Sequence, residues 1–588
     1  MKRTRVALAL MVIGLLLCGF ALFAHQLGLD NNPGWGARRY AVLLGGLSLF
    51  VLAALFQFKG RIFHRLPAWR PSSLPGWMTA LWNRRLVMLT VLSGLLIGVI
   101  YVFFISRGLW TVWPEISRDY DSLGAGFRAG DVYLHNEPPL SPALLSLPDP
   151  YDPDARNAIP AAKKSADSVW DLALFNGRLY LYWGPVPAVL LALIKLFYSA
   201  VIADQYVAFA FLIGLLIFSI LVILKLQRKF YPEAPVSLVL ICILAIGLVC
   251  PLPWMLGTAA IYEATILGGQ FFLVGGLYFA ISAFEGQSTS LYKPLLAVTF
   301  WMLAAGTRTI LLVPAVSSTL IILLWSLRND FDKKQPLKSL PRAILLSLPL
   351  AFGVGLYGWY NWARFGSIFE TGLRYTVTFL NLNKDIARTF SLNHFFASLW
   401  VFLINPFAVQ QTFPFLQALP GKFPSVLDFG QVLYYHSENI TGVLFCVPFV
   451  YFAAVPAWNT LATLSGKIRG KSLSPTDRPR EALLWVSLCV GLCTLLTFAA
   501  LLLYFNLAMR FLADFMPSLM LFSILGVFEG YHALRGKPYR QRIFMTLVFI
   551  IATTTITLSL LLAMSQSLTQ FQRYNRHLLK EMLQLFGG

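Results

Sequence analysis

Charged residues are scarce in this chain of 588 residues. Asp, Glu, Lys and Arg make up 12% of it, whereas hydrophobic residues make up 57%. An average soluble domain carries roughly twice that share of charge, so the composition excludes an ordinary soluble fold. Long apolar runs are present instead, for example 6–24, 86–105, 343–363 and 483–505. A run of about 18 or more such residues is long enough to cross the hydrocarbon core of a bilayer as a helix.

Regular alternation of polar and apolar residues is also missing from these runs. Because lipid offers no water to the backbone, a spanning segment must be a helix or a strand of a closed barrel, and barrel strands alternate. The sequence therefore predicts an all-α polytopic membrane protein with about thirteen transmembrane helices, in a range of about 11 to 15. The first run follows Lys2, Arg3 and Arg5 and has the form of a cleaved secretory signal. Its long apolar core and the many later runs favour an uncleaved first span.

Cysteine is rare, with six residues, and all six lie in apolar segments. Cys489 and Cys493 are four residues apart on one helix face, which is poor disulfide geometry, and no histidines stand at zinc-ligand spacing. Packing is the predicted role of all six.

Acidic residues are few relative to basic ones, 26 against 47, which gives a formal net charge of +21. The basic residues gather in short loops between apolar runs, as in cytoplasmic loops under the positive-inside rule, so nucleic-acid binding is not expected. The N-terminus is therefore predicted to be cytoplasmic and the C-terminus to lie outside. The basic loops assigned to the cytoplasm are 58–85, 226–233, 327–342, 464–480 and 535–542.

Two apolar runs, 185–202 and 395–407, are interrupted by prolines or a lysine and are predicted to lie at the interface or to re-enter. This topology places two long loops, 107–183 and 364–438, on the outer side. The first is rich in aromatic residues, contains the turn dipeptide Asn176-Gly177, and is too long for a simple connection. The chain then divides into an N-terminal hairpin with a linker, a transmembrane core, and a C-terminal loop with a last span and tail: 1–85, 86–530 and 531–588.

Ionisable residues at membrane depth are the candidate functional groups, because such groups are costly there and by default mark function. With their neighbours, they fall at or just beyond the predicted outer surface: Asp119, Asp121, Asp171, Glu263, Arg308, Arg364, Arg374, Arg510 and Asp514. Asp119 and Asp121 flank Tyr120 soon after the third span. Two such carboxylates can raise one another's pKa or jointly hold a divalent cation such as Mg²⁺ or Mn²⁺. Alternatively, they are solvated loop acids, or one of them caps a short helix.

The arginines also have two interpretations. Glu263 and Arg308 stand at the edges of apolar runs. A structural ion pair between helices explains such residues as well as a functional role does. Arg510 and Asp514 are four residues apart and can pair on a helix. The alternative is that outward-facing arginines clamp a phosphate group, which suits the planar guanidinium fork. Tyr182 and its aromatic neighbours are expected to anchor the loop at headgroup depth.

The order of these motifs resembles that of the C-type integral-membrane glycosyltransferases (GT-C superfamily) of bacteria, over roughly residues 86–530. The resemblance rests on these segments: Asp119-Tyr120-Asp121, Gly130-Asp131-Val132-Tyr133-Leu134, Leu147-Pro148-Asp149-Pro150-Tyr151-Asp152, Asp171 through Tyr180-Leu181-Tyr182-Trp183-Gly184-Pro185, Arg364-Phe365-Gly366-Ser367, Gly372-Leu373-Arg374-Tyr375, and Arg510 to Asp514. Many members carry adjacent acids in the first outer loop, whereas Tyr120 separates them here, and no separate soluble outer domain is recognised.

The resemblance implies transfer of a sugar from a polyprenyl-phosphate donor to a lipid or polysaccharide acceptor, at the periplasmic face of a bacterial inner membrane. It implies that Asp119 or Asp121 is the base or a metal ligand, with Glu115 in reserve, and that Asp171 or Glu263 supplies a second acid. The donor phosphate would be held by Arg308, Arg364, Arg374 and Arg510, with Tyr120, Tyr182 and Asp514 in support. Two other functions remain open: a transporter or flippase of lipid-linked saccharide, for which no internal repeat is recognised, and a non-catalytic membrane assembly factor.

Overall fold

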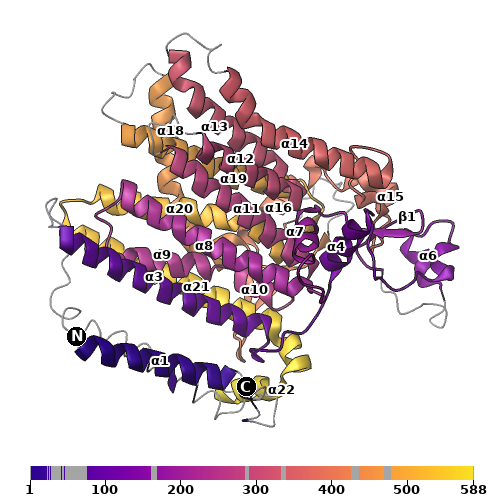
Figure 1. The fold of residues 1–588 in the computed structure, drawn as a ribbon, viewed down its shortest axis with the longest axis horizontal. Coiled ribbons are helices and arrows are strands. Elements are labelled where there is room, and N and C mark those ends of the chain that lie inside the picture. Colours follow the sequence, from indigo (N-terminus) through magenta and orange to yellow (C-terminus); the bar gives the residue numbers. More distant parts are fainter. Residues whose placement is uncertain are drawn as a thin grey trace.

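The computed structural model of the chain describes residues 76–159, 169–284, 291–332, 340–424, 436–468 and 478–586, and parts of residues 2–49. Helices packed side by side make up most of it (Figure 1). The predicted N-terminal hairpin has its second span at 40–57, and most of this range and of the basic loop 58–85 lie outside the described residues.

Seven helical segments in the described ranges are long and apolar enough to cross a bilayer, which indicates a multi-pass membrane protein. The helical membrane class is therefore confirmed, whereas the count of about thirteen spans stays a prediction. The seven lie in these helices: α3 (Gly76–Ile105), α8 (Asp204–Phe230), α11 (Ile261–Phe284), α13 (Leu312–Asp332, with its 3-10 turn η2, Thr309–Leu311), α14 (Leu340–Phe365), α19 (Arg478–Leu502) and α21 (Pro538–Tyr574).

Shorter helices complete the bundle. Seven of them are α1 (Lys2–Leu22), α9 (Val236–Gly247), α10 (Leu252–Leu256), α12 (Tyr292–Thr307), α18 (Ala454–Ile468), α20 (Met516–Ala533) and α22 (Arg576–Leu585). The interrupted runs form α7 (Val186–Ile194) and α16 (Phe395–Ile404), of nine and ten residues. At 1.5 Å per residue each rises only about 15 Å, half the thickness of the hydrocarbon core. Neither can cross the membrane alone.

The core is centred on α11, whose spanning window is 83% buried, against 11% for α14 at the periphery. Small residues on α11 allow this close approach. A Cβ on Gly275 would come within 2.5 Å of the Phe300 ring of α12, and one on Gly276 would meet the indole of Trp301. The Trp301 Nε1 donates a hydrogen bond of 3.2 Å to the Leu273 carbonyl oxygen, which fixes the ring against α11.

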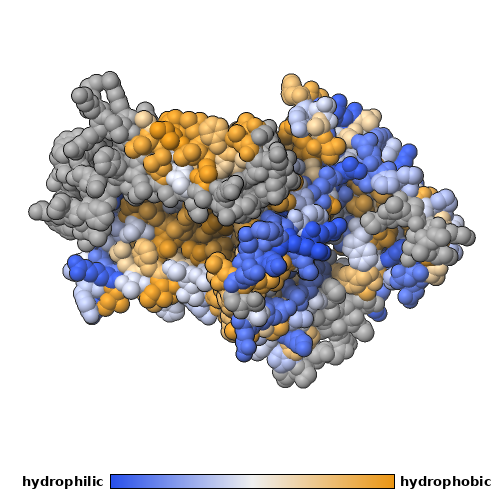
Figure 2. Space-filling view, turned by 90° about the horizontal axis from the view of Figure 1, so that it is seen from below, coloured by the Kyte–Doolittle hydropathy of each residue, from blue (hydrophilic) through white to orange (hydrophobic). Residues whose placement is uncertain are grey.

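The loops predicted to lie on the outer side, called the outer loops below, gather at one end of the bundle, beyond the helix ends (Figure 1). Figure 2 shows hydrophobic residues over the helical part and hydrophilic ones concentrated toward that end. The helices there are α4 (Asp119–Ala129), α5 (Pro142–Leu145), α6 (Pro153–Asn157) and α15 (Leu382–Asp385). Strands β1 (Ala173–Phe175) and β2 (Arg178–Tyr180) form a hairpin through Asn176 and Gly177, both at positive φ, as the turn dipeptide predicts.

Five short strands form two further sheets near this end. In one, β3 (Phe407–Val409), β4 (Leu416–Pro420) and β6 (Asn439–Ile440) pair antiparallel in the order β3-β4-β6. In the other, β5 (His436–Ser437) pairs in parallel with β7 (Asn506–Leu507), with His436 opposite Asn506. This second pair brings the outer loop before α17 (Val443–Cys446) against the segment that follows α19.

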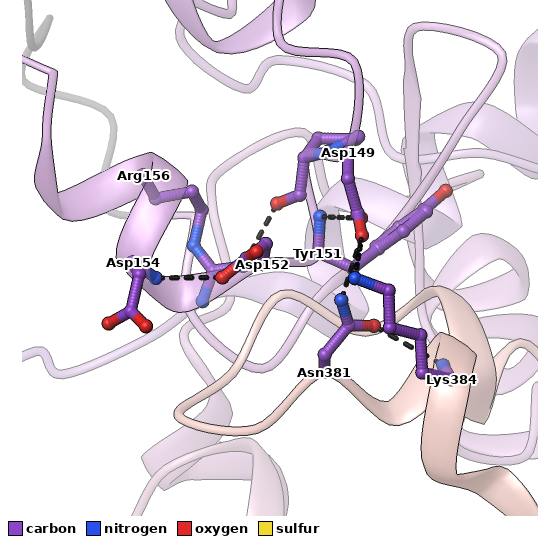
Figure 3. Close-up of polar contacts among 8 residues, drawn as sticks. Asp149, Tyr151, Asp152, Asp154, Arg156, Asn381 and Lys384 are labelled. Atoms are coloured by element: carbon purple, nitrogen blue, oxygen red, sulfur yellow. Dashed lines mark hydrogen bonds and ion pairs between the residues drawn. The ribbon is translucent and has the colours of Figure 1, made fainter.

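Asp149 ties the two outer loops to each other (Figure 3). Its carboxylate contacts the Lys384 ammonium at 3.0 Å and accepts a hydrogen bond of 2.9 Å from the Asn381 side-chain amide. Lys384 and Asn381 hydrogen bonds hold the pKa of Asp149 below its ordinary value, although burial acts in the opposite direction. Arg156 adds donated hydrogen bonds to the carbonyl oxygens of Pro150 and Thr378. The segment around α15 is therefore fastened to the first outer loop by side chains.

Candidate functional site

A cavity of about 560 Å³ lies where the outer loops meet the ends of α11, α13 and α19. Its ionisable lining residues are Asp171, Arg308, Glu438 and Arg510. Its aromatic lining residues are Trp170, Tyr182, Trp183, Tyr262, Phe379, Phe390, Tyr504, Phe505 and Phe511. Four of the sequence-predicted site residues, Asp171, Tyr182, Arg308 and Arg510, thus line one cavity.

One side of this cavity is apolar. Leu312 and Val313 of α13 and Leu501 of α19 line it, and these helices are candidate membrane spans. Val313 is 51% exposed, and Val316 and Leu320 continue its exposed stripe along α13 at helical spacing. The cavity is therefore lined by both charged groups and apolar residues that continue into the exposed stripe of α13, which suits an amphiphilic ligand.

Arg308 is held by a buried acid. It lies between α12 and η2, and its Nε and Nη2 donate to the two carboxylate oxygens of Asp514 at 3.0 and 2.7 Å. Asp514 ends the 3-10 helix η10 (Met509–Asp514), and its side chain is fully buried. The pair between Arg510 and Asp514, which their spacing allows on an α-helix, is not formed, because the segment is a 3-10 helix and Asp514 faces Arg308.

Arg510 is paired with Glu438 instead. Its Nη1 and Nη2 donate to the Glu438 carboxylate at 2.8 and 2.9 Å. The backbone fixes this acid, because the Glu438 N–H donates to the Leu507 carbonyl oxygen at 2.8 Å, directly beside the β5–β7 pair. Sequence reasoning missed Glu438, since it is an unremarkable acid in an outer loop until strand pairing brings it to Arg510.

Asp171 faces the same cavity from the first outer loop. Its φ of 59° is left-handed, a conformation that Asp tolerates better than most residues. Its N–H donates to the Val377 carbonyl oxygen at 2.8 Å, which anchors the backbone. The Tyr262 hydroxyl donates to its carboxylate, and the Arg510 guanidinium lies 4.8 Å from the centre of the Tyr262 ring. The contacts therefore run from Glu438 through Arg510 and Tyr262 to Asp171.

Asp121 and Tyr120 pack α4 against the bundle and do not line this cavity. The Asp121 carboxylate lies 2.8 Å from the Lys195 ammonium, with both side chains buried. It also accepts a hydrogen bond of 2.9 Å from the Ile202 N–H. The Tyr120 hydroxyl shares a buried hydrogen bond of 2.8 Å with Thr265 of α11.

Asp119 is half-buried at the start of α4, outside the cavity lining. The Asp204 side chain accepts hydrogen bonds from the backbone N–H groups of Asp119 and Tyr120 and from the Ser117 hydroxyl, so Asp204 caps the N-terminus of α4. Burial, together with the charges of Asp204 and Glu137, raises the pKa of Asp119 to about 8.

A divalent cation does not fit between Asp119 and Asp121. The Asp121 carboxylate already has the Lys195 ammonium as its cationic partner. In the ranges that the structure describes, no three His, Cys, Asp or Glu side chains are grouped so that they could hold a metal ion.

The three remaining predicted residues lie outside the cavity lining. Glu263 is buried and accepts a hydrogen bond of 3.0 Å from the Ala260 N–H at the start of α11. Arg364 is buried, donates to the Leu181 carbonyl oxygen and to Asn361, and stacks on Tyr360 with its guanidinium 3.9 Å from the ring centre. Arg374 is paired with Glu370 at 2.9 Å and is partly exposed.

Comparison with known proteins gives one distant likeness. No protein-family model matches the chain, and no curated protein matches it. Among solved structures, the chain is similar to the archaeal oligosaccharyltransferase AglB from Archaeoglobus fulgidus in complex with an inhibitory peptide and a dolichol-phosphate, with 13% sequence identity and a TM-score of 0.40. The match covers 87% of this chain and 60% of AglB. A likeness this distant establishes neither a family nor an activity.

Proposed function

We propose that this protein is a GT-C-type glycosyltransferase that moves a sugar from a polyprenyl-phosphate donor to a lipid or polysaccharide acceptor at the periplasmic face of a bacterial inner membrane. The observation that carries the proposal is the cavity itself. It combines two acids, two arginines and apolar residues continuous with an exposed apolar stripe of α13. A polyprenyl phosphate has the matching parts, a long apolar chain and one anionic group.

In this proposal Asp171 is the base. The acceptor hydroxyl gives its proton to the Asp171 carboxylate while its oxygen forms a bond to the anomeric carbon of the sugar. The bond between that carbon and the phosphate oxygen breaks, and polyprenyl phosphate leaves with the bonding electrons. The Tyr262 hydroxyl orients Asp171, with which it is hydrogen-bonded.

The arginines stabilise the charge that develops on the leaving phosphate. Arg510 is the main contact, and Arg308, held by Asp514, adds positive charge to the same cavity. Asp171 is preferred to Asp121 as the base because Asp121 is buried against Lys195. It is preferred to Asp119 because Asp119 does not line the cavity.

The test is sugar transfer by the purified protein from a labelled polyprenyl-phosphate sugar to an envelope lipid fraction, with Asp171→Asn compared with wild type. We expect kcat to fall by roughly 10²- to 10⁴-fold, because the base is lost while the shape is kept. Asp131→Asn is the matched control, since this partly exposed acid of the same loop pairs with His135 and lies outside the cavity lining. Full transfer by Asp171→Asn would overturn the assignment, and translocation of the donor without transfer would identify a flippase.

A further inference from the structure

The two arginine–carboxylate pairs of the cavity differ in how far they are exposed. In the pair formed by Arg308 and Asp514, the acid side chain is 0% exposed and does not line the cavity. In the pair formed by Arg510 and Glu438, the acid side chain is 35% exposed, and both partners line the cavity. Removing Asp514 from Arg308 would leave a buried charge uncompensated, whereas Glu438 is partly exposed and can leave Arg510 while remaining in the cavity.

Two polar atoms at the same place have unfulfilled hydrogen-bonding capacity. In the described part of the chain, neither the buried Nε of Arg510 nor the buried Oδ1 of Asn506 has a hydrogen-bond partner. Both residues line the cavity, and one atom is a donor while the other is an acceptor. Unpaired buried polar atoms of this kind are uncommon in native structures and call for a partner. Both side chains must shift to present these atoms to the cavity, where a sugar phosphate would offer an oxygen to Arg510 and a hydroxyl to Asn506.

The Glu438 carboxylate occupies the edge of Arg510 that a phosphate would use. A guanidinium binds carboxylate and phosphate in the same bidentate way, through two parallel N–H groups. Here Nη1 and Nη2 both point to Glu438, at 2.8 and 2.9 Å. An incoming phosphate therefore competes with Glu438 for these two donors.

We propose that Glu438 is a displaceable placeholder for the donor phosphate. On binding, the phosphate of a lipid-linked sugar takes the Nη1 and Nη2 donors of Arg510, and Glu438 swings into the cavity. After transfer, Glu438 returns to Arg510 and helps to expel the polyprenyl phosphate. Glu438 is thus a positioning residue that sets the affinity for the phosphate, and this role rests on the function proposed above.

The experiment measures the dissociation constant of a short-chain polyprenyl phosphate, for example a ten-carbon one, for the detergent-purified full-length protein. Glu438→Gln keeps the size of the side chain and removes the competing charge. We expect it to bind this ligand about fivefold more tightly than wild type, since partly exposed ion pairs are worth up to that factor. The corresponding uncharged alcohol should bind wild type and variant equally. Inorganic phosphate tests whether the site is built for a lipid phosphate or for free phosphate. A site for a lipid phosphate should bind inorganic phosphate much more weakly than the polyprenyl phosphate.

Two controls make the result specific. Asp131→Asn neutralises a partly exposed acid outside the cavity lining and should not tighten phosphate binding, whereas Arg510→Gln should abolish the gain when combined with Glu438→Gln. If Glu438→Gln does not fold, Glu438→Asp shortens the reach to Arg510 and should still tighten binding. Equal or weaker binding by a folded Glu438 variant overturns the placeholder.

The placeholder and the proposed reaction can fail independently. Tighter phosphate binding by Glu438→Gln in a protein with no transferase activity would keep the exchange and refute the reaction. If phosphate binding is unchanged in Glu438→Gln but transfer is lost in Asp171→Asn, the exchange is refuted and the proposed reaction is kept.

Discussion

Replacing Asp514 by Asn should destabilise the protein strongly. The change leaves the Arg308 guanidinium, whose side chain is only 15% exposed, without its carboxylate. Two charge-assisted hydrogen bonds, of 3.0 and 2.7 Å, lose their anionic acceptor. Breaking a buried ion pair on one side typically costs about 3–5 kcal/mol, because the remaining charge has no compensation. We expect the free energy of unfolding to fall by about that amount.

The assay is reversible unfolding in mixed micelles of a mild detergent and dodecyl sulfate. Glu438→Gln is the matched control, and because its side chain is 35% exposed the expected loss is about 1 kcal/mol or less. The double variant Arg308→Gln/Asp514→Asn should recover most of the stability, since it removes both charges. A loss below about 1 kcal/mol for Asp514→Asn alone would refute the claim that this pair is buried and structural.

Two further predictions concern the outer loop and the core. The folded pKa of Asp119, about 8, lies above the ordinary value of about 4, so protonated Asp119 favours folding and this contribution is lost as the pH rises through about 8. The melting temperature of wild type should therefore fall relative to that of Asp119→Asn between pH 5 and pH 8.5. Parallel melting-temperature curves for the two proteins would contradict this. Gly276→Ala should cost about 1–3 kcal/mol because its Cβ meets the Trp301 indole, whereas Gly98→Ala in α3, where a Cβ meets no described atom within 4 Å, should be neutral or slightly stabilising in the same assay.

Membrane class and helical fold could be predicted from the sequence because they depend on local properties. A helix of about 20 apolar residues signals its own position. The breaks in 185–202 and 395–407 likewise mark the helix ends, because α7 ends just before Lys195 and α16 ends two residues before Pro406. The turn at Asn176-Gly177 followed from turn chemistry alone, whereas the pairing of β1 with β2 across it was not predicted. The number of spans did not follow as directly, because several apolar helices, such as α9 and α12, are shorter than a bilayer crossing.

The site was only partly predictable because its contacts join distant segments. Asp171, Arg308 and Arg510 could be selected as ionisable residues at membrane depth. Their partners could not, since Arg308 pairs with Asp514 across 206 positions and Arg510 with Glu438 across 72. Spacing alone allowed a pair of Arg510 and Asp514, because the sequence does not show that 509–514 forms a 3-10 helix.

The preferred catalytic base changed from Asp119 or Asp121 to Asp171 for the same reason. Asp119 and Asp121 stand out in the sequence because two carboxylates flank one tyrosine. Whether such acids face a cavity or the protein interior depends on neighbours from other segments, here Lys195 for Asp121 and Asp204 for Asp119. Asp171 has no such motif around it, yet its backbone contact with Val377 holds it at the cavity.

The measurement that bears most directly on the central claim is the position of a bound polyprenyl phosphate in an experimental structure of the full-length protein in lipid nanodiscs. We expect the phosphate within hydrogen-bond distance of Arg510, the Glu438 carboxylate turned away from it, and the isoprenoid chain along Leu312 and Val313 of α13. A phosphate bound instead at Arg364 or Arg374, with the pair of Arg510 and Glu438 intact, would contradict the account.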